Sequence, residues 1–369
     1  MNVCHITSIH SSNDTRIFLK QCSTLITKGV EVTLIAPHDK DEVINGVTIK
    51  ALKNRSSAIT RILFSFPKIL FFSLNNKYDI YHAHDPELVP VLFILKIIGR
   101  KVIYDMHENF PKQIESKDLP KMLKALVSVI WPRIEYIAFR RIGVVFAETS
   151  YKEDYVYVKN SVDVLNMPLI KKIKKIKTVK NDRFTLGYVG GVSENRYCLR
   201  ILETLKRLQI SGVDIGFECV GPIYSESTKV KINRLCSNLN NVNFYGRLSP
   251  VEAWEKMKKC HIGIAVLMPE PNYINSYPTK LFEYLAMDIP VITSNFELYK
   301  DVVTTNNVGF CVDPVEPVEF ESAVLELYNN KKLLNKMSNN ASMITIDKFN
   351  WDNELEKLFR FYESLVDTI

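Results

Sequence analysis

The chain repeats one pattern twice, because short apolar segments of strand length alternate with stretches of helical periodicity in each half. Such alternation is typical of parallel sheets covered by helices. We therefore predict an α/β protein with two similar domains that face each other across a cleft. In the first half the expected strands are Val3–Ile9, Val32–Ala36, Val47–Lys50, Asp79–His84, Lys101–Met106 and Gly143–Ala147. In the second half they are Phe184–Gly190, Gly216–Val220, Val242–Tyr245, Gly263–Leu267, Pro290–Thr293 and Val308–Val312.

A charged segment at residues 171–182 separates the two sets of strands. It is rich in lysine and lacks the periodicity of a core element, which indicates a linker between domains. We therefore expect a first domain at residues 1–170 and a second at residues 183–345, followed by a terminal segment at residues 346–369.

The composition is that of an ordinary globular protein, with 46% hydrophobic and 24% charged residues. Its seven cysteines form no close pairs, which predicts neither a disulfide framework nor a thiolate metal site and suits a reducing cytosol. Met1–Ile6 lacks the basic leader of a signal peptide. Pro67, Lys68 and Lys96 interrupt the longest apolar stretches. We therefore expect a cytoplasmic protein, either soluble or peripheral at the inner face of the plasma membrane.

The positive charge lies in the first half of the chain. Residues 1–175 contain 26 Lys and Arg against 17 Asp and Glu, whereas residues 176–369 contain 22 against 24. Lys50–Lys77 and Lys121–Arg141 combine cations with large apolar residues, which is typical of segments that rest on an anionic membrane surface. The same pattern also fits core-packed helices with solvated outer faces. No nucleic-acid motif accompanies the modest pI of 8.8, so we expect no nucleic-acid partner.

Residues 278–294 form the most informative local segment. Pro278, Thr279 and Lys280 predict a loop that opens a short helix, with Glu283 in its first turn, a turn at Asp288 and then a buried strand. Free N–H groups at a helix start favour an anion such as a diphosphate, and a carboxylate one turn later can accept hydrogen bonds from a ribose diol. The same residues are also ordinary capping choices.

Polar residues follow several expected strands, where ligands of open parallel sheets bind. The glycine pair Gly190 and Gly191 would let a ligand approach the backbone, and Arg196 would neutralise a phosphate. In the first half the corresponding residues are Ser8, His10, Ser11, Asn13, Asp14, Arg16, His82, His84, Asp85, His107, Glu108 and Asn109. The His82-x-His84 spacing also fits a metal site, but no third ligand of obvious spacing is visible, so we expect no metal.

These residues resemble the retaining glycosyltransferases of the GT-B fold, specifically the family 4 group and its branch for bacterial surface polysaccharides. The resemblance rests on five segments spread over nearly the whole chain: Asp14–Phe18 with Lys28–Thr33, Asp79–Asp85, Val102–Glu108, Pro278–Ser294 and Phe349–Trp351. It implies two Rossmann-like domains, the first for the acceptor and the second for the nucleotide. It also implies that the terminal helix, in residues 346–369, crosses back to the first domain.

The resemblance assigns roles to individual residues. Glu283 matches the second glutamate of the E-x7-E motif, which binds the donor ribose, and Asn275 stands in place of the first glutamate. Gly191 replaces the usual phosphate-binding arginine, and Arg196 stands in for its lysine partner. His107 matches a histidine near the reacting centre. The implied donor site comprises Gly190, Gly191, Arg196, Pro278, Thr279, Lys280 and Glu283, and the implied acceptor site comprises Asn13, Asp14, Arg16 and His84.

We therefore predict an enzyme that moves a sugar from a UDP- or GDP-sugar to a lipid-linked glycan acceptor in the synthesis of O-antigen, capsule or exopolysaccharide. The predicted transfer retains configuration and needs neither cofactor nor metal, because cations and helix N–H groups stabilise the departing diphosphate. Two alternatives stay open: a GT-B sugar-nucleotide epimerase and a catalytically silent sugar-nucleotide or glycan binder. A dehydrogenase is disfavoured, because no Gly-x-Gly-x-x-Gly follows the first strand of either half.

Overall fold

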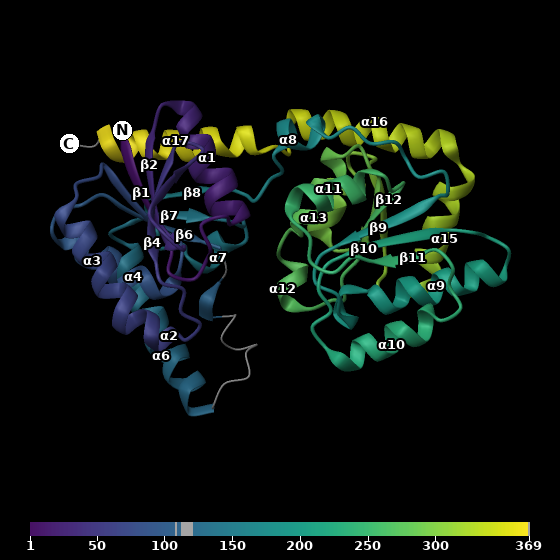
Figure 1. Ribbon diagram of the computed structural model, residues 1–369, viewed down its shortest axis with the longest axis horizontal. Helices are drawn as coiled ribbons and strands as arrows, with labels where there is room; N and C mark the ends of the chain where they lie inside the picture. Colours follow the sequence, from purple (N-terminus) through teal and green to yellow (C-terminus); the bar gives the residue numbers. More distant parts are fainter. Residues whose placement is uncertain (108, 112–120, 368–369) are drawn as a thin grey trace. The chain divides into compact units, whose positions relative to one another are not determined.

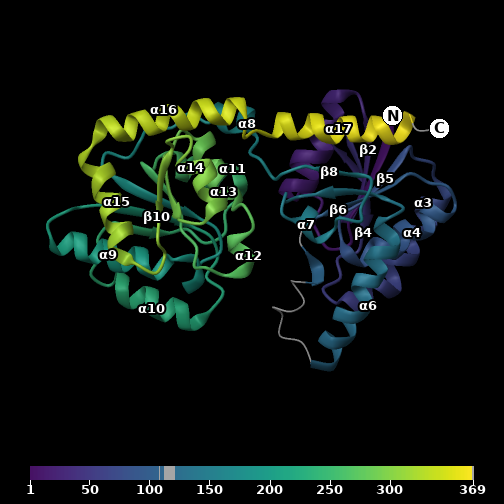
Figure 2. The same cartoon turned by 180° about the vertical axis from the view of Figure 1, so that it is seen from behind.

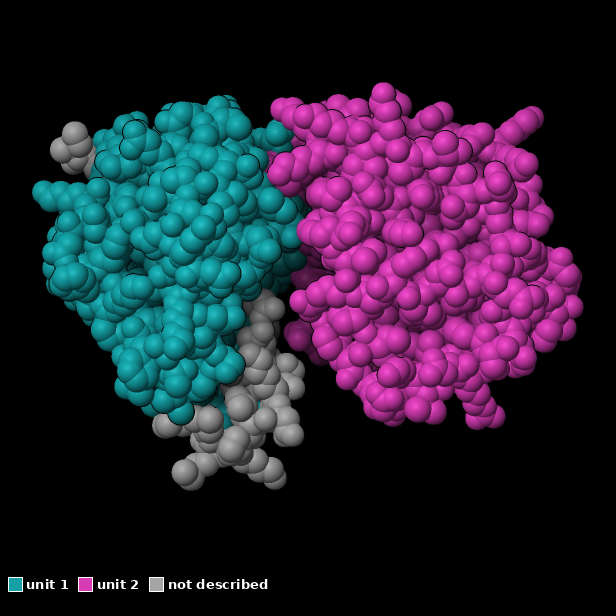
Figure 3. Space-filling view, in the orientation of Figure 1, with its two compact units in different colours: residues 1–166, 352–369 teal, residues 167–351 magenta. Residues whose placement is uncertain are grey.

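The computed structural model describes residues 1–107, 109–111 and 121–367 of the chain. It divides into two compact units, residues 1–166 with 352–369 and residues 167–351 (Figure 3). Each unit has its own hydrophobic core. Each also has its own sheet, which is parallel except for one edge strand of unit 1 (Figure 1). Glu108, the last residue of one of the five segments named above, lies outside the described residues.

Unit 1 contains an eight-stranded sheet in the order β3-β4-β2-β1-β5-β6-β7-β8. All neighbouring strands are parallel except β3, which pairs antiparallel with β4. The strands are β1 Asn2–Ile6, β2 Glu31–Pro37, β3 Glu42–Ile44, β4 Val47–Leu52, β5 Ile80–Ala83, β6 Val102–Met106, β7 Gly143–Phe146 and β8 Ser161–Asp163. The near-continuous burial of β5, β6 and β7 fits a sheet that is covered on both faces.

The helices of unit 1 form two layers (Figure 2). Side chains of α3, α4 and α6 pack into one core with Cys4, Tyr81 and Tyr104 of the sheet. Helix α17 contacts His82 on the other face of the sheet. His82 and Tyr81 are neighbours on β5, so their side chains point to opposite faces. The bounds are η1 Thr15–Cys22, α1 Ser23–Leu25, η2 Ile26–Lys28, α2 Ala58–Thr60, η3 Arg61–Ser65, α3 Phe66–Asn75, η4 Pro86–Leu88, α4 Val89–Ile97, α6 Lys121–Phe139, α7 Tyr151–Asp154 and α17 Trp351–Asp367.

Unit 2 contains a six-stranded parallel sheet in the order β11-β10-β9-β12-β13-β14. Its strands are β9 Thr185–Val189, β10 Gly216–Val220, β11 Val242–Phe244, β12 Ile262–Ala265, β13 Val291–Ser294 and β14 Gly309–Val312. Its helices are α8 Ile170–Lys175, η5 Glu194–Arg196, α9 Cys198–Ile210, α10 Glu226–Cys236, α11 Pro250–Lys258, α12 Pro271–Ile274, α13 Thr279–Ala286, α14 Glu297–Val303, α15 Pro317–Asn329 and α16 Lys331–Asp347.

Residues 171–182, which we expected to be a linker, lie within unit 2. The segment begins with α8, in which Ile173 is fully buried and the ammonium of Lys174 pairs with Asp288. This helix has no readable core periodicity, because lysines surround its one buried residue, Ile173. In the part of the chain that the structure describes, no helix is long and apolar enough to cross a bilayer.

Candidate functional site

The carboxyl end of β9 in unit 2 is shaped by glycines. Gly190 and Gly221 have φ angles of +132° and +146°, a region that side chains rarely tolerate. A Cβ on Gly221 would lie 1.8 Å from the carbonyl oxygen of Gly190, and one on Gly191 would lie 2.9 Å from the ring of Tyr224. Only glycine at 190 and 221 therefore lets the ends of β9 and β10 come so close together.

Two cations lie beside this glycine turn. An Nη of Arg196 would be 3.5 Å from a Cβ at Gly190 or Gly191, and its Nε is 3.4 Å from the hydroxyl of Tyr273. The Nζ of Lys280 lies 3.9 Å from the ring centroid of Tyr188, and Lys280 is only 8% exposed. The hydroxyl end of the Tyr188 side chain lies next to Gly190. These contacts therefore bring the predicted residues Gly190, Arg196 and Lys280 together.

Lys280 is buried without a hydrogen-bond partner for its ammonium among the described residues. Burial, followed by the positive charge of Arg196, lowers the pKa of Lys280 to about 7. A buried ammonium is costly unless a partner compensates it, and the ring of Tyr188 supplies only part of that compensation. The arrangement therefore favours an anion next to Lys280 and Arg196.

Helix α13 is held in place by Tyr284, which comes one position after Glu283. The hydroxyl of Tyr284 accepts a hydrogen bond of 2.8 Å from the backbone N–H of Val189 at the end of β9. Its ring lies against Gly263, where a Cβ would come within 2.3 Å. The start of α13 and the end of β9 are thus fixed at the same edge of the sheet.

The first turn of α13 has no side-chain cap, and Pro278 is the residue that precedes it. The prediction that Glu283 lies in the first turn is wrong, because the helix begins at Thr279 and places Glu283 in its second turn, half-buried. Thr279 is exposed at the helix start. Asn275, which stands in place of the first glutamate of the motif, is exposed at the end of α12.

A cavity of about 930 Å³ opens at the opposite edge of this sheet. It is lined by Thr185 and Gly216, the first residues of β9 and β10, together with the basic residues Lys177, Lys180 and Arg183. Ligands of open parallel sheets bind at the carboxyl ends of the strands, so the position of this cavity argues against a donor site there.

In unit 1 a buried ion pair joins η1 to β6. Asp14 caps η1 by accepting hydrogen bonds of 2.8 Å from the backbone N–H groups of Arg16 and Ile17. Arg16 then reaches Asp105 with Nη2 at 2.8 Å and Nε at 3.3 Å, and Gln21 donates to the same carboxylate. Burial alone would raise the pKa of Asp105, but Arg16 and His107 outweigh it and hold this pKa well below its usual value.

This pair corrects the expected role of Arg16. We predicted that Arg16 contacts the acceptor, but its side chain is only 6% exposed and is committed to Asp105 and the carbonyl of Val164. Arg16 therefore has a structural role in the interior of unit 1. Asp105, which the sequence did not single out, is the residue around which the neighbouring side chains are arranged.

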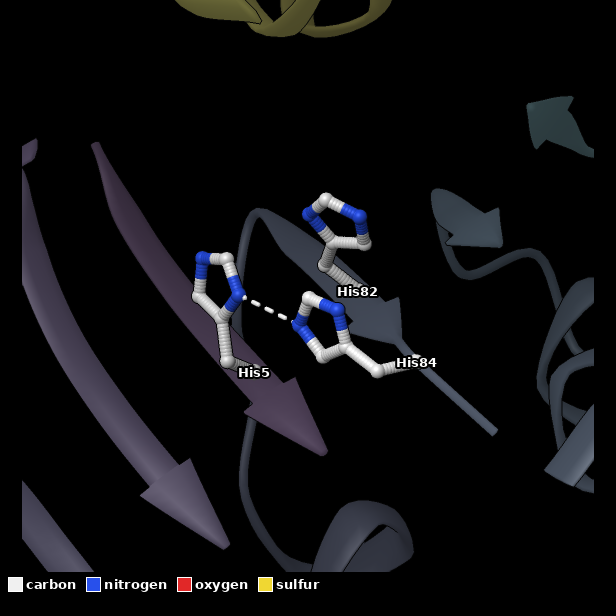
Figure 4. Close-up of side chains that lie close together, drawn as sticks. All are labelled: His5, His82 and His84. Atoms are coloured by element: carbon white, nitrogen blue, oxygen red, sulfur yellow. Dashed lines mark hydrogen bonds between the residues drawn. The ribbon is translucent and has the colours of Figure 1, made fainter. Parts of the chain in front are cut away.

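Three buried histidines, His5, His82 and His84, lie close together (Figure 4). Ring nitrogens of His82 and His84 lie 4.0 and 3.3 Å from Oδ2 of Asp105. The ring nitrogens of His5 and His84 are 2.9 Å apart, and His82 stacks on His84. Tyr362 of α17 contacts His82 Nδ1 at 2.5 Å and His5 Nε2 at 3.3 Å. Burial lowers the pKa of all three histidines, so they are neutral at pH 7.

His107, predicted to lie near the reacting centre, sits at the open end of this network. Its Nε2 lies 3.2 Å from His84 Nδ1 and 3.1 Å from Asp105 Oδ2, and 18% of its side chain is exposed. His84 is only 2% exposed, so it contacts His107 and does not reach the surface that an acceptor would touch. His10 lies beside His107, with ring centroids 5.7 Å apart.

Asp14 and Asn13 complete the described surface around His10. Nδ1 of His10 lies 3.6 Å from Asp14, and Nε2 lies 3.6 Å from the buried carboxylate of Asp85. Burial raises the pKa of Asp14, but bonds from His10 and Ile17 outweigh it and lower the value to about 2. Asn13 is exposed nearby and accepts a hydrogen bond from Ser11. Among the predicted acceptor residues, Asn13 and Asp14 are thus accessible, whereas Arg16 and His84 are buried.

The atoms around Asp105 also have the spacing of metal ligands. His84 Nδ1, His107 Nε2 and Asp105 Oδ2 lie 3.1 to 3.3 Å from one another, close to the edges of a zinc tetrahedron. The guanidinium of Arg16 already neutralises Asp105, however, and a second cation would be repelled by it. A hydrogen-bonded network therefore fits these residues better than a metal centre.

The comparisons with known proteins agree with this architecture. The family described as Glycosyl transferases group 1 matches residues 170–343, which lie within unit 2. The capsular polysaccharide biosynthesis glycosyltransferase CapM of Staphylococcus aureus is 22% identical over 195 residues. That match covers 51% of this chain and 49% of CapM, so the chain spans about half the length of this curated relative.

Solved structures match over nearly the full length. Sucrose-phosphate synthase of Thermosynechococcus elongatus has a TM-score of 0.75 at 14% identity, covering 99% of this chain and 98% of its own. A glycosyltransferase of Rickettsia africae has a TM-score of 0.75 at 15% identity, covering 100% and 99%. The Anabaena protein HepE, solved with UDP and glucose, has a TM-score of 0.72 at 14% identity, covering 99% and 100%.

At these identities the structural matches establish the fold alone. The family match concerns the part of the chain that lies in unit 2. The predicted α/β architecture with two parallel-sheet domains is confirmed. The chain has the two-domain fold of these solved glycosyltransferases, and its residues 170–343 match the family described as Glycosyl transferases group 1.

Proposed function

We propose that the protein transfers a sugar from a UDP- or GDP-sugar to a lipid-linked glycan acceptor in the synthesis of a bacterial surface polysaccharide, either O-antigen, capsule or exopolysaccharide. The similarity to a capsular polysaccharide glycosyltransferase supports the pathway class. HepE was solved with UDP and with UDP-glucose, which makes UDP-sugars the first donors to test.

The observation that carries this proposal is the unpartnered ammonium of Lys280 beside Arg196. Neither residue forms an ion pair within the described parts of the chain, although both lie at the carboxyl end of β9 next to a glycine turn. The uncapped start of α13, which Pro278 precedes, adds the backbone N–H groups of Thr279 and Lys280 at the same edge. A diphosphate matches this combination in charge and in hydrogen-bonding needs.

The proposed reaction retains the configuration of the sugar. The bond between the anomeric carbon and the phosphate oxygen breaks, and its electron pair leaves with the nucleoside diphosphate, which Arg196 and Lys280 stabilise. The acceptor oxygen attacks the same face of the oxocarbenium-like sugar, and its proton passes to the departing phosphate oxygen. In this scheme Glu283 binds the donor ribose, Asn275 contacts the donor sugar through its amide, and His107 orients a reacting hydroxyl.

A panel of UDP- and GDP-sugars tests the donor assignment through thermal stabilisation, because a ligand that binds only the folded state raises its melting temperature. We expect one nucleotide series to stabilise the protein and a lipid-linked acceptor to be required for turnover. Conversion of the donor without any acceptor would instead assign an epimerase. Tight donor binding without turnover on any lipid-linked acceptor would assign a silent binding protein.

A further inference from the structure

One outer layer of unit 1 exposes many large apolar side chains. Helix α4 packs between α3 and α6, and η3 continues into α3, so these helices form one surface (Figures 1 and 2). We call it the basic helical face. Of the sixteen large hydrophobic residues described as exposed in residues 1–166, thirteen lie on it: Ile59, Ile62, Leu63, Phe64, Phe71, Leu74, Ile94, Ile97, Ile98, Val129, Ile130, Tyr136 and Ile137.

Its charge has one sign. Residues 50–78 contain six Lys or Arg and no acidic residue, and residues 89–101 contain three and no acidic residue. In residues 124–141 the only carboxylate is Glu135, which is 2% exposed and accepts hydrogen bonds from Trp131 and Tyr155. Two of these cations are paired with carboxylates from outside these helices, Lys50 with Asp41 and Arg61 with Glu87. The other cations have no carboxylate of these helices exposed among them.

The cations lie next to the apolar side chains. The guanidinium of Arg55 lies 4.5 Å from the ring centroid of Phe64, and that of Arg140 lies 5.1 Å from the ring of Tyr136. Phe64 and Phe71 are 57% and 71% exposed. Monomeric proteins rarely leave such contiguous apolar surface in water, and aromatic rings beside cations are typical of helices that lie in a membrane interface.

We propose that the basic helical face docks on an anionic lipid bilayer, with its aromatic and aliphatic side chains in the headgroup region and its lysines and arginines on lipid phosphates. Charge complementarity selects this partner, because a lipid surface supplies both apolar depth and a layer of negative charge. Since no described helix is fit to cross a bilayer, docking is peripheral. The inference goes beyond the proposed sugar transfer and explains how the chain would reach a lipid-linked acceptor.

Sedimentation with vesicles tests this directly. We expect the full chain to bind vesicles of phosphatidylglycerol and phosphatidylcholine at low salt, to dissociate at high salt and to ignore pure phosphatidylcholine. Lys96→Glu/Arg133→Glu should weaken binding by at least about 30-fold, from about 1 kcal/mol for each cation removed. The control Lys332→Glu/Lys336→Glu makes the same change of net charge at exposed positions of unit 2 and should bind like the wild type.

The apolar contribution has its own matched pair. Phe64→Ser/Phe71→Ser should reduce vesicle binding, whereas Met343→Ser/Ile346→Ser, which removes side chains 70% and 63% exposed on α16, should not. Donor-induced thermal stabilisation should be unchanged in all four variants, so failure here is distinct from failure of the proposed transfer. Equal binding by both members of either pair would overturn the proposal. So would self-association that Phe64→Ser/Phe71→Ser abolishes, without vesicle binding, because it would assign the face to a second copy of the chain.

Discussion

Tyr362 of α17 places its hydroxyl 2.5 Å from Nδ1 of His82 on β5, and the two residues are separated by 280 positions in the chain. The contact is fully buried and forms part of unit 1, to which residues 352–369 belong. A terminal helix is thus fixed through a polar bond to the histidines next to Asp105.

Replacing Tyr362 by Phe keeps the ring but removes the hydroxyl that contacts His82 and His5. We expect the free energy of unfolding to fall by about 1–3 kcal/mol, because buried ring nitrogens lose their partner. Urea denaturation followed by circular dichroism measures this change. The control Tyr224→Phe, at a side chain 74% exposed, should have almost no effect, and equal stabilities of the two variants would contradict the account.

The Arg16–Asp105 pair predicts a larger loss. Arg16→Met should cost about 3–5 kcal/mol of unfolding free energy, because it leaves a buried carboxylate without its cation. Arg183→Met, which breaks an exposed pair with Asp214, should cost no more than about 1 kcal/mol. A double-mutant cycle with Asp105→Asn should show strong coupling to Arg16, and additive effects would count against a buried ion pair.

The three buried histidines predict acid sensitivity. Their pKa values are lowered in the folded protein, mainly by burial, so the unfolded chain binds more protons below about pH 6.5. Stability should therefore be full near pH 7.5 and should fall as the pH drops below about 6.5. Urea midpoints at pH 7.5 and pH 5.5 check this direction, and an unchanged midpoint would show that these rings are not forced to stay neutral.

Lys280 predicts a pH dependence of nucleotide binding. Its pKa of about 7 in the free protein must rise when a diphosphate binds beside it. Affinity for UDP should then fall by up to about tenfold per pH unit above pH 7, because binding takes up a proton. Calorimetric titrations between pH 7 and 9 measure this slope.

The matched variants are Lys280→Met, which should bind weakly with a flat pH profile, and Lys229→Met, at an exposed lysine of α10, which should behave like the wild type. A wild-type affinity that does not change with pH, or a slope that persists in Lys280→Met, would remove Lys280 from the diphosphate site.

The strand pattern predicted most of the fold, because all twelve expected strands are present. The missed strands β3 and β8 have three residues each and lie at the edges of the sheet, too short for an apolar run. The turn Asn45–Gly46 between β3 and β4, with φ angles of 51° and 81°, was a readable hairpin signal.

The site was less readable, because its geometry depends on residues distant in sequence. Arg16 follows an expected strand, which is where ligand-binding residues are found, but its side chain is buried in an ion pair with Asp105. Lys280 was placed in the implied donor site, but its burial depends on Tyr188 and on the contact of Tyr284 with β9. No local pattern reports such contacts.

The central claim is that unit 2 binds the donor nucleotide at Glu283, Lys280 and Arg196, and titration of the stabilising nucleotide sugar into the Glu283→Ala variant tests it most directly. We predict measurable binding to the wild-type protein, a loss of at least about tenfold in Glu283→Ala from the missing charge-assisted hydrogen bonds, and an unchanged affinity in the control Glu297→Ala. Wild-type affinity in Glu283→Ala, together with unchanged turnover at saturating donor, would contradict the assignment.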